Sequence, residues 1–171
     1  MNLNKTTKWM SYEELLPEIR LGDIVEIKRP FYAHASIVVD IHGKKITVVH
    51  VDGNKARTLV TTRSNVHQDP LEDVYHGDDV RINNGFDKEV PPSDVDSIVE
   101  AAKRRVGQVY KYHLIEQNCQ HFATQLRYND KEGWSWESHD LNWVEELRKH
   151  DEERKRQEAM EKQASQCCIV S

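Results

Sequence analysis

The sequence is poor in cysteine: it has three in 171 residues, and two of these are adjacent at positions 167 and 168. This excludes a disulfide framework and indicates a reducing compartment. The sequence also lacks any apolar run near the roughly 20 residues of a membrane-spanning helix, and its first ten residues lack the apolar region of a secretory signal. We therefore expect a cytoplasmic protein, or one attached to a membrane from its cytosolic side.

A one-sided charge distribution is missing as well. The formal net charge is −5, from 24 basic and 29 acidic residues that are interspersed along the chain. Proteins that bind nucleic acid usually carry a concentrated basic surface, so no nucleic-acid partner is expected. With 37% hydrophobic and 31% charged residues, a chain of this length suits one globular domain and a solvated segment.

Hydrophobic periodicity predicts strands first and helices later. A short helix is expected at the Ser11–Glu14 capping-box pattern, and a longer one from the similar pattern at Ser93–Asp96 to Gly107. Runs of β-branched or alternating residues predict strands at residues 23–28, 35–40, 45–51, 57–63 and 74–82, with a hairpin turn at 41–44 and a polar loop after residue 63. This order predicts an α+β domain with a small antiparallel sheet and a helix packed on it.

The composition changes near residue 141. Residues 1–140 are expected to form the globular domain, and residues 141–171 a charged tail that is helical and solvated over most of its length. The tail ends in the letters CCIVS. A cysteine, two aliphatic residues and a serine fit the farnesylation pattern, which predicts a prenyl group on Cys168 and makes Cys167 a candidate for a second, acyl group. The alternative is an accidental tetrapeptide.

The most informative stretch is Asn118-Cys119-Gln120-His121-Phe122, which places the one internal cysteine at the expected start of a helix. Asn118 is a favourable N-cap, and apolar residues recur at helical spacing after it. A thiol in the first helical turn lies beside unpaired backbone N–H groups, and such a position generally favours the nucleophilic thiolate. Cys119 is therefore a candidate nucleophile, and the alternative is a small buried hydrophobic residue.

A thiol enzyme also needs an imidazole within hydrogen-bond reach and a third group that orients this imidazole. Of the nine histidines, His34 and His50 lie in neighbouring predicted strands and can lie side by side in an antiparallel pair. If the helix of Cys119 packs across them, a Cys-His-His relay follows. Spacing alone leaves open that both are ordinary polar residues. His121, two residues along the helix from Cys119, is expected to face away from the thiol and to be structural.

Three segments, RPFYAHASIVV, ITVVHVDG and VGQVYKYHLIEQNCQHFATQLRYN, resemble the corresponding blocks of the lecithin retinol acyltransferase-like family, and most closely its small phospholipase A and acyltransferase branch. The resemblance spans roughly residues 21–129 and preserves the order and approximate spacing of the blocks. It implies a circularly permuted papain-like fold of the NlpC type. By the same resemblance, Cys119 would be the nucleophile, His34 the general base and acid, and His50 the orienting third member.

The family resemblance implies a phospholipase A1/A2 and acyltransferase that uses no metal or other cofactor. Such an enzyme forms an acyl thioester from a glycerophospholipid and passes the acyl group to water or to an amine or hydroxyl acceptor. Its expected location is the cytosolic face of a membrane, where lipid groups on Cys168 and Cys167 would hold it, and no protein partner is indicated. The alternatives are a prenylated membrane adaptor that retains the fold, and a cysteine peptidase or amidase.

Two departures from the family pattern concern the surroundings of the site. The family often has Glu where Gln120 stands and Trp where Ala35 stands. Neither change removes a catalytic group, but both lie where they would alter the acyl-binding groove. The chemistry is therefore better specified by the sequence than the substrate is.

Overall fold

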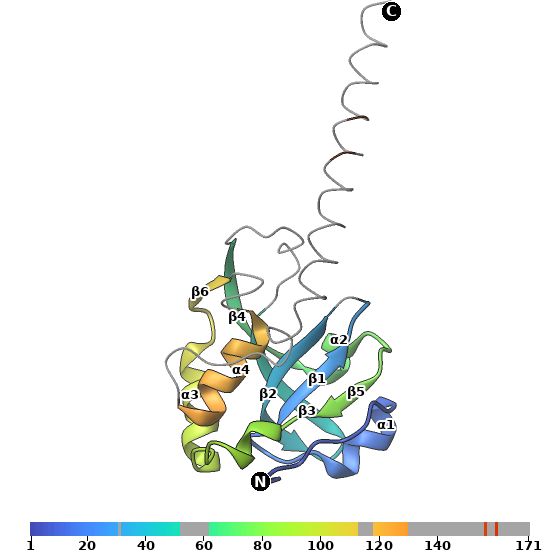
Figure 1. Ribbon diagram of the computed structural model, residues 1–171, viewed down its shortest axis with the longest axis vertical. Helices are drawn as coiled ribbons and strands as arrows, with labels where there is room; N and C mark the ends of the chain where they lie inside the picture. The colour runs from blue at the N-terminus through green and yellow to red at the C-terminus, as the bar shows by residue number, and fades with distance from the viewer. Residues whose placement is uncertain (31, 52–61, 113–117, 130–155, 157–159, 161–171) are drawn as a thin grey trace, which may run out of the picture.

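The computed structural model describes residues 1–30, 32–51, 62–112, 118–129, 156 and 160. Within these residues the chain forms a six-stranded antiparallel sheet in the order β5-β1-β2-β3-β4-β6, with helices on both of its faces (Figure 1). The predicted α+β class is confirmed.

The described elements follow one another as the predicted order requires, strands mainly first and the longer helices last. The strands are β1 (Ile24–Lys28), β2 (Ala33–His42), β3 (Lys45–Val51), β4 (Thr62–Pro70), β5 (Val80–Ile82) and β6 (Val109–Tyr112). The helices are α1 (Tyr12–Leu15), α2 (Leu71–Tyr75), α3 (Val95–Arg105) and α4 (Cys119–Tyr128), with the 3-10 turns η1 (Leu16–Glu18) and η2 (Gly85–Lys88).

The first three strands lie where the residue pattern predicted them. The hairpin between β2 and β3 is tighter than expected, because β2 continues to His42 and the turn consists of Gly43 and Lys44. Gly43 has a φ of 61°, a left-handed conformation that glycine adopts without steric cost. A register shift between Val38 and Asp40 of β2 then places Ser36 opposite His50.

The prediction is wrong for the segment after β3. Residues 64–70, expected as part of a polar loop, belong to β4, which pairs with β3 on one side and β6 on the other. Of this strand, Val66 is buried while Arg63 and His67 are exposed, so its own hydrophobic pattern is weak. Pairing with two neighbours decides its conformation. Of the strand predicted at 57–63, residues 57–61 lie outside the described residues.

Two further boundaries differ from the prediction. The strand expected at 74–82 is divided into α2, a turn in which His76 has a φ of 54°, and the short β5. The N-cap of α3 is Asp94, one residue after the predicted Ser93, and its side chain accepts a hydrogen bond from Ser97 N at 2.9 Å. Gly107, with a φ of 79°, follows the end of α3 as expected.

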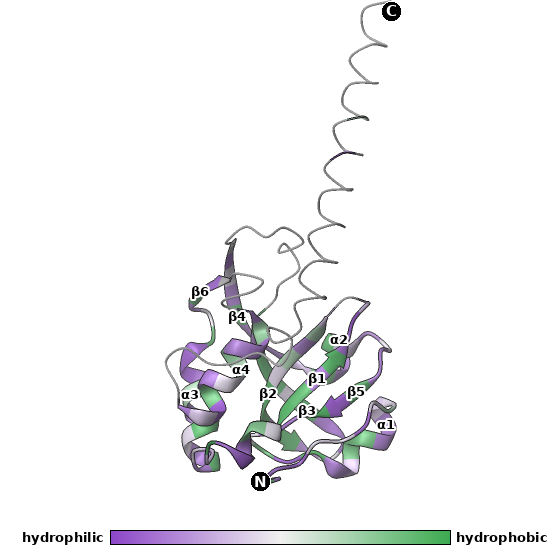
Figure 2. Cartoon of the chain, viewed as in Figure 1, coloured by the Kyte–Doolittle hydropathy of each residue, from purple (hydrophilic) through white to green (hydrophobic). Residues whose placement is uncertain are grey.

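The sheet separates two hydrophobic layers, and hydrophobic residues follow its central strands in Figure 2. On one face, Ile98 of α3 and Phe122 of α4 belong to the layer that contains Ile37 and Val49. On the other face, α1 and α2 cover a layer that includes Val38, Val48, Leu15 and Leu71. Successive residues of β2 and β3 therefore point into different layers, so these strands are buried on both faces.

The predicted tail lies almost wholly outside the described residues. The division after residue 140, the charged helix, and the lipid groups on Cys167 and Cys168 therefore remain predictions. Among the helices that the structure describes, none combines the length and the hydrophobicity of a membrane span.

Candidate active site

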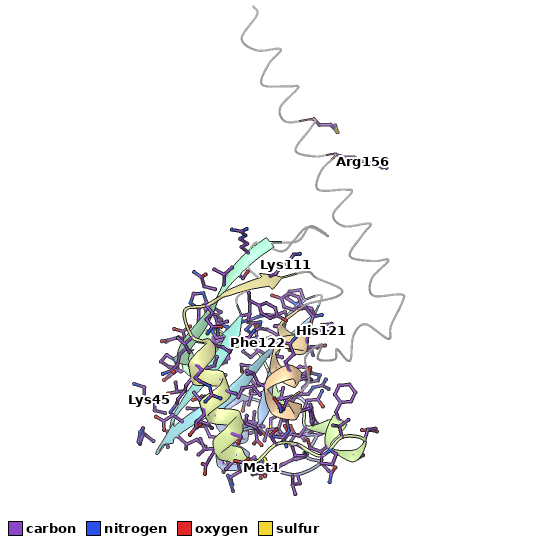
Figure 3. The ribbon with its side chains drawn as sticks, turned by 90° about the vertical axis from the view of Figure 1, so that its left-hand side faces the viewer. Met1, Lys45, Lys111, His121, Phe122 and Arg156 are labelled. Atoms are coloured by element: carbon purple, nitrogen blue, oxygen red, sulfur yellow. The ribbon has the colours of Figure 1, made fainter. Side chains whose placement is uncertain are left out.

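Cys119 is the first residue of α4, as the sequence predicted. Asn118 caps this helix, because its side-chain oxygen accepts hydrogen bonds from the backbone N–H groups of Gln120 at 2.9 Å and His121 at 3.2 Å. In Figure 3, His121 and Phe122 lie at the end of α4 that is nearer to Lys111 of β6. The cap thus fixes the first turn of the helix in the same part of the domain as the ends of β4 and β6.

The ring of His121 completes the cap rather than joining the thiol. Asn118 N donates to His121 Nδ1 at 3.3 Å, which closes a capping box. Burial lowers the pKa of His121 to about 4, so the ring is neutral at pH 7 and able to accept this hydrogen bond. The structural role that the sequence analysis expected for His121 agrees with these contacts.

The thiol of Cys119 is buried against strand β2. Its Sγ lies 3.5 Å from Ala35 N and 3.7 Å from Ala33 O, the backbone atoms of the two residues that flank His34. The Ala35 N–H points at the sulfur and the Ala33 carbonyl accepts from it, so the backbone of β2 holds the thiol in one position. Helix α4 thereby brings Cys119 to the strand that carries His34.

His34 and His50 form a hydrogen-bonded pair. His34 Nε2 lies 3.0 Å from His50 Nδ1, and the two rings are nearly perpendicular, at 89° with centroids 5.1 Å apart. Both side chains leave the sheet on the same face, because Ser36, two residues after His34, stands opposite His50 in the β2–β3 register. The structure therefore places two of the predicted residues, His34 and His50, in direct contact, and it places Cys119 against the backbone on either side of His34. The catalytic roles of all three stay predictions.

A further polar residue, Asp69, lies next to His50 and extends the hydrogen-bonded pair into a row; the sequence analysis did not indicate it. His50 Nε2 lies 3.1 Å from Asp69 Oδ2 on β4. Asp69 stands opposite Val48 and so leaves the sheet on the same face as His50, two residues along β3. Because the polar segment around Asp69 was expected to be a loop, no signal in the sequence placed it beside β3.

Electrostatics keep His34 neutral. Burial lowers the pKa of His34 well below its usual value, and the charges of His50 and Arg29 act in the same direction. A neutral imidazole has one unprotonated ring nitrogen and can accept a proton at pH 7. The Nε2 atom of His34 is engaged by His50, so Nδ1 is the ring nitrogen outside that contact.

Gln120, the residue after Cys119, is hydrogen-bonded to a buried carboxylate. Gln120 Nε2 donates to Glu26 Oε1 at 3.2 Å, and Glu26 also accepts from Arg81 Nε at 2.7 Å and Asn83 Nδ2 at 3.0 Å. These contacts fasten the first turn of α4 to β1 and β5. An amide at position 120 suits this place, because a second carboxylate beside Glu26 would add a like charge in a buried site.

Comparison with known proteins shows the family to which this sequence is related. The profile described as lecithin retinol acyltransferase matches residues 17–132, a range that contains His34, His50, Asp69 and Cys119. The protein named phospholipase A and acyltransferase 1 of Rattus norvegicus is 34% identical over 114 residues, which cover 64% of this chain and 68% of that relative.

Two human relatives give similar values. Phospholipase A and acyltransferase 4 of Homo sapiens is 37% identical over 116 residues, or 65% of this chain and 71% of the relative. Phospholipase A and acyltransferase 3 of Homo sapiens is 33% identical over 118 residues, or 66% of this chain and 73% of the relative. Because the profile spans the described domain and these relatives align over most of their own length, the chain belongs to the lecithin retinol acyltransferase family.

Proposed function

We propose that this protein is a phospholipase A and acyltransferase that works through an acyl thioester on Cys119. The observation that carries the proposal is a thiol at the start of a helix, held against the backbone on both sides of a buried, neutral imidazole. The names of the relatives support the reaction class, since they couple phospholipid hydrolysis with acyl transfer.

In the first half-reaction, the sulfur of Cys119 attacks the ester carbonyl carbon of a glycerophospholipid. His34 takes the thiol proton as the C–S bond forms, which its lowered pKa permits at neutral pH. The C–O bond of the ester then breaks, and His34 returns the proton to the leaving lysophospholipid oxygen. The acyl group remains on the sulfur as a thioester.

In the second half-reaction, water or an amine or hydroxyl acceptor attacks the thioester carbonyl. His34 takes the proton of the attacking group, the C–S bond breaks, and the departing thiolate regains its proton from His34. Water gives a free fatty acid, an amine gives an amide and a hydroxyl gives an ester. Throughout, His50 holds the ring of His34 through its 3.0 Å hydrogen bond.

Trapping the thioester tests this function. Brief mixing of the protein with phosphatidylcholine vesicles is expected to add the mass of one fatty acyl group to the peptide that contains Cys119. Hydroxylamine at neutral pH should remove it, because thioesters are cleaved under conditions that spare amides. Peptide mass spectrometry locates the adduct, and a Cys167→Ser/Cys168→Ser protein, which lacks the other thiols, should form it equally.

Turnover of phosphatidylcholine by a protein that never carries an acyl group on Cys119 would contradict the thioester mechanism. If neither adduct nor turnover appears with any glycerophospholipid, while a peptide amide is cleaved, the peptidase or amidase alternative is favoured. Binding to membranes without either reaction would favour the adaptor.

We further propose that the enzyme acts at the cytosolic face of a membrane and is held there by lipid groups on Cys168 and Cys167. The support is the sequence pattern of these residues. One lipid chain gives only marginal, reversible attachment, whereas two give stable attachment. We expect Cys168→Ser to shift the protein to the cytosolic fraction and Cys167→Ser to give an intermediate distribution. Fractionation of cells tests this, and a Cys168→Ser protein as membrane-bound as the wild type would refute it.

A further inference from the structure

We propose that Asp69 is a positioning residue that fixes the tautomers of His50 and His34, so that His34 presents an unprotonated nitrogen to Cys119. This inference rests on the proposed function of Cys119 and His34. It adds a carboxylate from a third strand to the end of the row, and so extends the predicted triad to Cys-His-His-Asp.

The hydrogen bonds determine where each proton lies. A carboxylate only accepts, so at the 3.1 Å contact His50 Nε2 carries the hydrogen and donates to Asp69 Oδ2. When His50 is neutral, its other nitrogen is then an acceptor, so His50 Nδ1 accepts from His34 Nε2 at 3.0 Å. By the same rule, His34 Nδ1 has no hydrogen. It is the nitrogen that can take the proton of the thiol.

Without the carboxylate, the pair of rings has a second arrangement. His50 Nδ1 could carry the hydrogen and donate to His34 Nε2, and the hydrogen of His34 would then lie on Nδ1. In that state His34 cannot accept the thiol proton. Asp69 therefore selects one of two arrangements, which differ only in the direction of every hydrogen bond in the row.

Asp69 also matters after proton transfer. When His34 holds the proton of Cys119, the positive charge is buried, and the hydrogen bond through His50 connects it to a negative carboxylate. The side chain of His50 is 9% exposed and that of Asp69 is 45% exposed, so the row runs from the buried thiol to the solvated edge of the face.

The register of β4 explains why Asp69 rather than its neighbour acts on His50. His67 stands opposite His50, and its exposed ring lies 6.0 Å from the His50 ring at an interplanar angle of 38°. Asp69, two residues further on, reaches the Nε2 atom instead. A ring contact of this kind cannot orient the hydrogen on His50, whereas a carboxylate can.

The first experiment determines tautomers and requires no substrate. Long-range ¹H–¹⁵N correlation spectra of the labelled wild-type protein at pH 7.5 are expected to show His50 and His34 both protonated at Nε2. In Asp69→Asn, whose amide can donate to His50 Nε2, the hydrogen of His50 should move to Nδ1. A wild-type His50 protonated at Nδ1 would overturn the proposal without any variant.

The second experiment measures turnover of dispersed phosphatidylcholine. Asp69→Asn is expected to lower kcat/KM at least about 30-fold, a part of the roughly 10²- to 10⁴-fold that a general base contributes. Asp69→Glu keeps a carboxylate and should return activity to within about fivefold of the wild type. Recovery of activity in Asp69→Glu but not in Asp69→Asn would show that the carboxylate positions His50 and that the side chain is not merely structural.

The same sheet offers matched controls. Asp40 and His42 form another Asp–His pair at 3.1 Å, with Asp40 42% exposed and His42 82% exposed. Asp40→Asn therefore removes an equal contact outside the site and should leave kcat/KM within twofold, as should His67→Asn, which removes the ring beside His50. An Asp69→Asn protein with unchanged tautomers and activity within twofold would overturn the proposal. A wild type with the expected tautomers but no turnover would instead refute the proposed function.

Discussion

Cys119→Ser is expected to lose at least about 10³-fold in kcat/KM for acyl transfer, in the range that removal of a nucleophile costs other enzymes. A serine hydroxyl is far less acidic than a thiol, and the proposed base, His34, is buried, has a lowered pKa and is a weak base. The fold should persist, because the hydroxyl is smaller than the thiol and can donate to the Ala33 carbonyl that the thiol contacts. Turnover of dispersed phosphatidylcholine measures the loss, and thermal unfolding checks the fold.

The effects of changing Cys119 and His34 should not add, because the two residues are expected to act together. Adding His34→Ala to Cys119→Ser is expected to lower the residual rate little further, because the base has no thiol left to serve. Cys167→Ser is the matched control for removal of a thiol, and on dispersed lipid it should keep full activity. A folded Cys119→Ser protein that retains a tenth of the wild-type rate would exclude the thioester.

Arg127→Met is expected to cost about 3 to 5 kcal/mol in the free energy of unfolding, the range for breaking a buried ion pair from one side. The side chains of Arg127 and Asp87 are 0% and 1% exposed. Arg127 Nε lies 2.8 Å from Asp87 Oδ1, and its Nη2 lies 2.7 Å from Asp87 Oδ2. Removal of the guanidinium leaves the Asp87 carboxylate buried without its cation. Urea unfolding at pH 7 measures the change.

Two further variants test whether burial of the Arg127–Asp87 ion pair causes the expected loss of stability. Arg104 and Glu100 form an exposed pair at 3.4 Å with side chains 71% and 70% exposed, so Arg104→Met should cost less than about 0.5 kcal/mol. In Asp87→Leu/Arg127→Met both charges are gone, and the stability should recover in part. An Arg127→Met protein within 1 kcal/mol of the wild type, on the order of an exposed pair, would contradict the expected cost.

The Arg127 contacts also bear on the candidate site, because they hold the far end of α4, the helix that begins at Cys119. Arg127 Nη1 donates to the carbonyl of Gly22 at 2.6 Å, just before β1, and Tyr128 Oη donates to Asp87 Oδ1 at 2.8 Å. At the other end of α4, Gln120 binds Glu26 of β1. Helix α4 is thus fastened at both ends to β1 and its flanks, which fixes Cys119 relative to β2.

The start of α4 and the first three strands could be predicted from the sequence because the interactions that decide them are local. Asn118 caps a helix through contacts within three residues, and the side-chain alternation of β2 and β3 is visible in their own letters. The turn between these strands, together with the register shift between Val38 and Asp40, then places His34 beside His50. Two of the three predicted catalytic groups were therefore already neighbours at the level of a hairpin.

The remaining features were decided by tertiary structure. β4 has a polar sequence and becomes a strand only because β3 and β6 lie on either side of it, and this pairing alone brings Asp69 to His50. Arg127 contacts Asp87, which is 40 residues away in the sequence, and no residue spacing in the sequence indicates this pair. The sequence by itself indicated the candidate residues Cys119, His34 and His50 and the helix that begins at the thiol. Only the folded sheet determined that His34, His50 and Asp69 lie next to one another across β2, β3 and β4. Contacts between distant strands depend on all the elements packed around them.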